Sequence, residues 1–167
     1  PNVVPDFAEV YYYSRHPDPK VVASIWERIE KAAKGAALGT GTTVEAEVLN
    51  AVYPMMPNNV LATVTHRNLS IVGGVNYTAE EKSFANELSK SFGKRAKPVE
   101  NSNNIGKLML DTGYVMPGST DVGDVSWVAP TNMLSTATWV PGTPAHSWQA
   151  VAAGTMTIGL KGMHVAS

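Results

Sequence analysis

The sequence DPKVVASIWERIEKAAKG at residues 18–35 decides the expected fold. It opens with Asp18 and Pro19, a pair typical of the N-cap and the first position of a helix. Apolar residues then recur three or four positions apart, at Val21, Val22, Ile25, Trp26, Ile29, Ala32 and Ala33. This spacing predicts a helix that runs from residue 19 to Gly35.

The segments on either side of this helix favour strands. In residues 3–13, the side chains of Ala8, Val10 and Tyr12 alternate with more polar neighbours, as in a half-buried strand. Residues 43–52 form a second run rich in β-branched residues. Strand, helix and strand within about 50 residues make a βαβ-type unit, which is too small to be a stable domain alone. The predicted fold class is therefore α/β.

Two prolines, Pro54 and Pro57, interrupt the chain after this unit. They place a domain boundary between a first part, residues 1–54, and a second part, residues 55–167. The second part is expected to open with a helix that Asn58 or Asn59 caps and that the glycine pair at 73–74 ends.

The rest of the second part alternates helix signals with polar loops. Thr78 and Glu81 have the spacing of a capping box, so a helix should follow them. Residues 117–124 read as a tight loop that opens a short helix, and residues 133–139 as a buried strand. Ser147 is expected to cap a final helix after the loop at residues 140–147.

Composition excludes several classes of protein. Thirteen Lys and Arg against fourteen Asp and Glu give a net charge of -1, which argues against nucleic-acid binding and against a basic membrane-surface protein. The sequence has no run of about 18 apolar residues, so it predicts no membrane-spanning helix. The chain has no cysteine, which excludes disulfides, thiolate nucleophiles and Cys-type zinc sites.

The two polar loops hold the best candidates for chemistry. His146 could bind a metal or act as a base, or it could be a hydrogen-bonded structural histidine. Asp121 and Asp124 would share one face of a first helical turn, where they could orient a histidine or a metal-bound group, or simply cap the helix. Arg15, at the end of the first predicted strand, could clamp a carboxylate or be an ordinary surface residue.

Three motifs together resemble a known family: PNVVPDFAEVYYYSR at 1–15, GSTDVGDVSW at 118–127 and PGTPAHSWQ at 141–149. They are similar to segments of the aminoacylase/carboxypeptidase G-type metallopeptidases, in the branch that contains the p-aminobenzoyl-glutamate hydrolases and related amidohydrolases. The resemblance covers essentially the whole chain. It implies the second half of a βαβ-type lid that dimerises, followed by the C-terminal part of an α/β zinc-peptidase catalytic domain.

The resemblance also implies roles for individual residues. His146 matches the last metal ligand, and the metal would be a divalent ion, zinc or manganese. Asn2 and Arg15 match lid residues that hold the substrate. Gly118, Ser119 and Thr120 match the family's loop near the substrate. Asp121 and Asp124 match residues that orient this loop and the metal ligands.

The family's other metal ligands and its general base lie upstream of these motifs and are absent here. The resemblance therefore implies an incomplete amidohydrolase that cleaves N-acyl amino acids such as aminobenzoyl-glutamate, binds no metal alone and is inactive alone. Expected partners are a small N-acyl amino acid or dipeptide-like substrate, a second copy through the lid, and the missing N-terminal part. The cytoplasm is the family default. The alternative is a non-catalytic binding or assembly module that keeps the fold without the metal centre.

Overall fold

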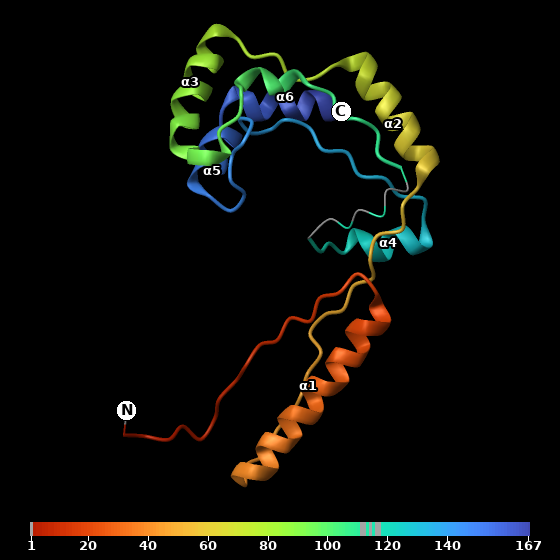
Figure 1. The fold of residues 1–167 in the computed structure, drawn as a ribbon, viewed down its shortest axis with the longest axis vertical. Helices are drawn as coiled ribbons and strands as arrows, with labels where there is room; N and C mark the ends of the chain where they lie inside the picture. Colours follow the sequence, from red (N-terminus) through yellow and green to blue (C-terminus); the bar gives the residue numbers. More distant parts are fainter. Residues whose placement is uncertain (1, 111–112, 114, 116–117) are drawn as a thin grey trace. The chain divides into compact units, whose positions relative to one another are not determined.

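The computed structural model describes residues 2–110, 113, 115 and 118–167, and this part of the chain is helical (Figure 1). The α-helices are α1 (Pro19–Thr40), α2 (Asn59–Val72), α3 (Ala79–Ser89), α4 (Val122–Val128), α5 (Trp148–Gly154) and α6 (Thr157–Ala166). Two 3₁₀ helices, η1 (Lys90–Arg95) and η2 (Val99–Asn103), follow α3. None of the helices in these ranges combines the length and apolar character needed to cross a membrane.

The helix starts lie where the capping residues predict them. The Asp18 carboxylate accepts a hydrogen bond from the Lys20 N–H at 2.8 Å and begins α1. Asn58, rather than Asn59, caps α2. At α3 both bonds of the predicted capping box, between Thr78 and Glu81, are present. Ser147 caps α5 as expected. These predictions are confirmed because a cap depends on residues within one turn of each other.

Two helix ends differ from the prediction. The first helix continues through Gly35 to Thr40 and ends where Gly41 adopts a left-handed conformation with φ of 68°. The predicted final helix is two helices, α5 and α6. The Cα of Gly159 in α6 packs against the Gly154 carbonyl at the end of α5, an approach that leaves no room for a Cβ. The chain therefore bends between the two helices.

The predicted strands are not confirmed. Residues 3–13, 43–52 and 133–139 have no regular secondary structure, and the described ranges contain no strand. The predicted buried strand at 133–139 is also largely exposed at its start, where Met133 is 55% accessible. The physical reason is that a strand requires hydrogen bonds from a neighbouring strand, which an alternating pattern alone cannot supply. The α/β class and the βαβ-type lid therefore remain unconfirmed.

The chain divides into two compact units, each built from two stretches of sequence. The first unit comprises residues 1–56 and 114–129, and the second comprises residues 57–113 and 130–167. The first break lies close to the predicted boundary after residue 54, but residues 114–129 group with the first unit. The assignment of residues 1–54 to a lid and 55–167 to a catalytic domain stays a prediction.

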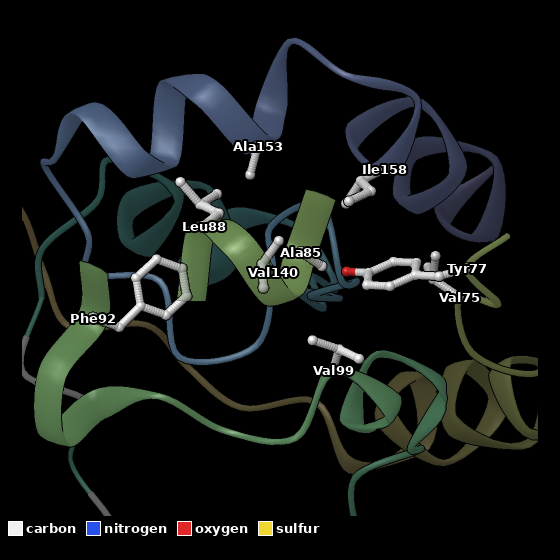
Figure 2. Packing of buried hydrophobic residues seen from close by; sticks show 9 residues of the cluster. All are labelled: Val75, Tyr77, Ala85, Leu88, Phe92, Val99, Val140, Ala153 and Ile158. Atoms are coloured by element: carbon white, nitrogen blue, oxygen red, sulfur yellow. The ribbon is translucent and has the colours of Figure 1, made fainter. Parts of the chain in front are cut away.

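The second unit has a hydrophobic core (Figure 2). Ala153 of α5 and Ile158 of α6 are directed toward Ala85 and Leu88 of α3. The core comprises Val75, Tyr77, Ala85, Leu88, Phe92, Val99, Val140, Ala153 and Ile158. It joins segments from both stretches of sequence that form this unit.

A buried carboxylate reinforces this packing between α3 and α6. Glu81 accepts hydrogen bonds from the Thr157 hydroxyl and the Lys161 ammonium, both at 2.6 Å, in addition to its capping bond. Burial alone would raise the pKa of Glu81, but these hydrogen bonds and the Lys161 charge outweigh it and lower the pKa to about 2. The charged form of Glu81 is therefore part of the folded structure.

Candidate functional site

The loop that carries His146 is fixed at both ends. Val140, at its start, is 1% exposed and belongs to the core. The Thr143 hydroxyl donates to the Val140 carbonyl at 2.6 Å, and the Ser147 hydroxyl donates to the Pro144 carbonyl at 2.6 Å. At Gly142, with φ of 92°, a Cβ would collide with the Arg95 carbonyl, so this close approach requires glycine. The loop conformation is therefore determined by packing and hydrogen bonds.

His146 lies at the end of this loop in an unusual backbone conformation. Its φ is 56°, and it is the only non-glycine with a positive φ in the described part of the chain. Such a conformation costs on the order of 1 kcal/mol or more and persists where the surrounding structure fixes it. The imidazole is exposed. The structure thus holds an accessible imidazole at a defined position.

His146 does not form a metal site with the other residues that the structure describes. Among the described residues, no three His, Asp or Glu side chains lie close enough together to hold a metal ion. A zinc site takes at least three protein ligands. The described residues therefore do not fit a metal centre by themselves.

The loop before α4 carries the predicted substrate residues. Gly118 and Ser119 are exposed, and Thr120 is half-buried. The Thr120 hydroxyl accepts a hydrogen bond from the Val122 N–H at 3.3 Å and lies 3.4 Å from the Asp121 carboxylate. Asp121 occupies the N-cap position of α4, yet its side chain makes no capping bond. The exposed face of this loop is available to a ligand.

Asp124 binds a distant part of the same unit. Its Oδ1 accepts a hydrogen bond from the backbone N–H of Tyr53 at 2.8 Å. Two further side chains of α4 bind the same segment. The Ser126 Oγ accepts from the Met56 N–H at 2.8 Å, and the Trp127 indole N–H donates to the Pro54 carbonyl at 2.9 Å. The structure therefore gives this helix a role that the sequence pattern does not reveal.

Asn2 and Arg15, the predicted lid residues, lie in the first unit with exposed side chains. Arg15 has no ion pair with any residue that the structure describes. The first unit also contains residues 118–124, whereas His146 belongs to the second. The structure thus brings residues 118–124 together as one loop and helix start. It shows no hydrogen bond that joins Asn2 or Arg15 to them.

A shallow groove in the second unit was not predicted. It has a volume of about 400 Å³ and is lined by residues that include Lys97, Asn101, Asn104, Thr138 and Trp139. It lies beside the start of the loop that carries His146, since Pro141 and Gly142 also line it. No sequence pattern indicates this groove, because its walls are about 40 residues apart in the chain.

Comparison with known proteins gives relatives among hydrolases. The chain is 34% identical, over an alignment of 190 residues, to the B subunit of p-aminobenzoyl-glutamate hydrolase from Escherichia coli (strain K12). The alignment covers all of this chain and 39% of that protein. The chain is also 28% identical to the Xaa-Arg dipeptidase of Mus musculus and 34% identical to that of Homo sapiens, with 78% of this chain and 23% of each relative covered.

The chain thus spans well under half the length of the curated relatives it matches. No family model matches the sequence. No solved structure matches it either.

Proposed function

The chain belongs to the aminoacylase/carboxypeptidase G-type metallopeptidase family, and on this premise we propose that it forms part of an amidohydrolase that cleaves N-acyl amino acids such as aminobenzoyl-glutamate. The observation that carries the proposal is the 34% identity to the B subunit of p-aminobenzoyl-glutamate hydrolase across the whole chain. The names of the other relatives, both Xaa-Arg dipeptidases, also describe hydrolysis of an amide bond. The shared chemistry is hydrolysis next to an amino acid.

In this proposal the exposed imidazole of His146 is one ligand of a divalent metal, zinc or manganese. The fixed loop and the left-handed backbone at His146 support a role that needs a defined imidazole position. The described residues do not complete a metal site, and the resemblance implies that the remaining ligands and the general base lie upstream of this segment.

The residues of the first unit would bind the substrate. Arg15 has an exposed guanidinium without an ion pair in the described structure, and a guanidinium binds a carboxylate through two parallel hydrogen bonds. Asn2 would add an amide donor, and the exposed loop from Gly118 to Thr120 would contact the acyl group. Asp121 and Asp124 would support this loop and the metal ligands, and a second copy of the chain would pair through the lid.

The test is hydrolysis of p-aminobenzoyl-glutamate by the intact enzyme, which contains these residues together with the missing N-terminal part, and by its His146→Asn variant. Asparagine tolerates the left-handed backbone, so this variant removes the imidazole without adding strain. We expect activity to fall about 100-fold or more and bound metal to decrease. The matched control is His164→Asn, which changes an exposed histidine in the last turn of α6. Unchanged metal content and activity in His146→Asn would remove His146 from the proposal.

A second variant, Arg15→Ala, tests whether Arg15 binds the carboxylate of the substrate. We expect the KM for a substrate with a free carboxylate to rise roughly tenfold, and the KM for the corresponding amide to stay within about twofold. Arg28→Ala is the control, because Arg28 is exposed on α1 and has no ion pair in the described structure. Equal effects on both substrates would reject the carboxylate clamp. If the intact enzyme, with the missing N-terminal part present, hydrolysed neither aminobenzoyl-glutamate nor an Xaa-Arg dipeptide, the non-catalytic binding or assembly module would be favoured.

A further inference from the structure

His146 lies between two segments that the core of the second unit fixes in place. Before it, Val140 is 1% exposed, and after it, Ala150 and Ala153 of α5 are 9% and 0% exposed. Ala145 and His146 themselves are exposed, so the packing of their side chains contributes little to their backbone conformation. Hydrogen bonds within the loop are therefore the interactions that hold the backbone at His146.

The first half of the loop is a turn that ends before His146. The Val140 carbonyl accepts the Thr143 N–H at 3.0 Å and the Thr143 hydroxyl at 2.6 Å. Pro141 and Gly142 occupy the two central positions, and Gly142 has a φ of 92°, as in a type II turn. This turn fixes the chain up to Thr143, and another interaction must fix the residues between Thr143 and α5.

The hydroxyl of Ser147 supplies that interaction, because it makes two hydrogen bonds in opposite roles. It donates to the Pro144 carbonyl at 2.6 Å and accepts from the Ala150 N–H at 3.3 Å. A serine hydroxyl has one proton and two lone pairs, so both bonds exist at once. The first bond reaches back across His146, and the second ties the same oxygen to α5. One side-chain oxygen thus connects the loop before His146 to the helix after it.

The bond to Pro144 opposes a conformational cost at His146. A φ of 56° is uncommon for a residue with a Cβ. The cost of such a conformation and the net contribution of one hydrogen bond are similar in size. Without the bond to the Pro144 carbonyl, the exposed backbone at His146 loses the interaction that balances this cost.

We propose that Ser147 is the positioning residue for the His146 imidazole, and that it acts by donating its hydroxyl proton to the Pro144 carbonyl. Because the backbone is fixed on both sides, a change of φ at His146 redirects its Cβ and therefore its ring. An ordinary helix cap needs only an acceptor oxygen, so the donated bond is a second role of Ser147. The effect on catalysis rests on the proposed function of His146, whereas the effect on its backbone does not.

Three variants separate the donated bond from the cap. Ser147→Ala removes both bonds, and Ser147→Thr keeps both. Ser147→Asp keeps a capping acceptor for the Ala150 N–H, but an ionised carboxylate has no proton to donate to Pro144. The Ala150 N–H also donates to the Ser147 backbone carbonyl at 3.2 Å, a bond that every variant keeps, so α5 should form in all of them.

The first measurement is the ¹⁵N order parameter of the His146 amide in the intact enzyme, labelled in histidine and freed of metal by a chelator. The signal is identified by its loss in His146→Asn. We expect about 0.85 in the native enzyme and in Ser147→Thr, and a fall below about 0.6 in Ser147→Ala and Ser147→Asp. An unchanged value in Ser147→Ala would overturn the proposal. A native value in Ser147→Asp would also overturn it, because the cap alone would then suffice.

The second measurement is hydrolysis of p-aminobenzoyl-glutamate by the same variants of the intact enzyme, with its metal present. In Ser147→Ala and Ser147→Asp we expect kcat to fall about five- to tenfold and KM to stay within about twofold, with Ser147→Thr close to native. The control is Asn58→Asp, which places the same carboxylate at the N-cap of α2 and should change neither constant.

The two measurements distinguish failure of this proposal from failure of the proposed function. If His146→Asn kept full activity, the proposed function of His146 would fail, and the order parameter alone would decide whether Ser147 holds its backbone. If His146→Asn lost activity but Ser147→Ala and Ser147→Asp kept a native kcat, Ser147 would not be a positioning residue for the reaction.

Discussion

The two units differ in what holds them together. The second unit has a core in which Val75, Val140 and Ile158 are less than 2% exposed. In the first unit, only Ala37 of the 22 residues of α1 is buried, and Val4 and Phe7 are 91% and 76% exposed. The second unit is therefore stabilised by buried apolar surface, and the first by helix hydrogen bonds and by the hydrogen bonds between residues 53–56 and α4. Burial and hydrogen bonding can thus be tested separately in one chain.

The largest expected effect comes from replacing an isoleucine by alanine in each unit and comparing the loss in the free energy of unfolding. Ile158→Ala should lower the free energy of unfolding of the second unit by about 3 kcal/mol, because it leaves a cavity at a fully buried position. Ile25→Ala, at a half-buried position of α1, should cost about 1 kcal/mol or less. Amide exchange of core residues in each unit measures both values. Equal losses of unfolding free energy in the two variants would mean that Ile25 is as deeply buried as Ile158.

A smaller effect comes from the carboxylate that joins α3 and α6. Glu81 has a lowered pKa in the folded protein, so it contributes stability above its ordinary pKa of 4.5, and this stability is lost as the pH falls toward 2. Glu81→Gln should remove roughly 1 to 2 kcal/mol at pH 7 and flatten the dependence of stability on pH between 5 and 2. Urea unfolding at a series of pH values measures this.

The matched control for that measurement is Glu87→Gln. Glu87 lies on the same helix, but its side chain is exposed and pairs with Lys90 at the surface. Surface pairs contribute little, so this variant should keep the pH dependence of the parent. The same flattening in both variants would show that the net charge of α3, and not the bonds to Thr157 and Lys161, determines the effect.

The smallest effect has the opposite sign and concerns the first unit. A Cβ at Gly35 would meet no atom within 4 Å, and Gly35 lies inside α1. Gly35→Ala should therefore stabilise α1 by about 0.5 to 1 kcal/mol, as measured by amide exchange within the helix. Gly41→Ala should destabilise it, because Gly41 ends the helix with a φ of 68°. A loss of stability in Gly35→Ala would indicate a contact of α1 that the structure does not show.

The sequence was most informative where structure depends on near neighbours. Asp18, Asn58, Thr78 and Ser147 begin helices as predicted, since each cap acts within one turn. The predicted strands were not confirmed because pairing depends on a second strand that the pattern does not specify. The end of α1 was predicted too early, because Gly35 continues the helix, and the left-handed conformation that ends it is adopted by Gly41 instead.

The candidate site followed the same rule. The two polar loops were found because glycines, prolines and hydroxyl residues mark them locally, and the structure shows that His146 is exposed on a fixed loop. The hydrogen bonds between α4 and residues 53–56 could not be predicted, because Asp124 and Tyr53 are 71 positions apart. The partners of Glu81 could not be predicted either. The capping box already accounts for Glu81 in the sequence, and Lys161 lies 80 positions away.

The division of the chain has a consequence for its synthesis. Residues 114–129 belong to the first unit, yet they lie between the two stretches that form the second. A ribosome therefore cannot finish the first unit until residue 129 has emerged, and it cannot finish the core of the second until Ile158 of α6 follows. Neither unit exists as one uninterrupted stretch of sequence, so neither can be completed before part of the other has been synthesised.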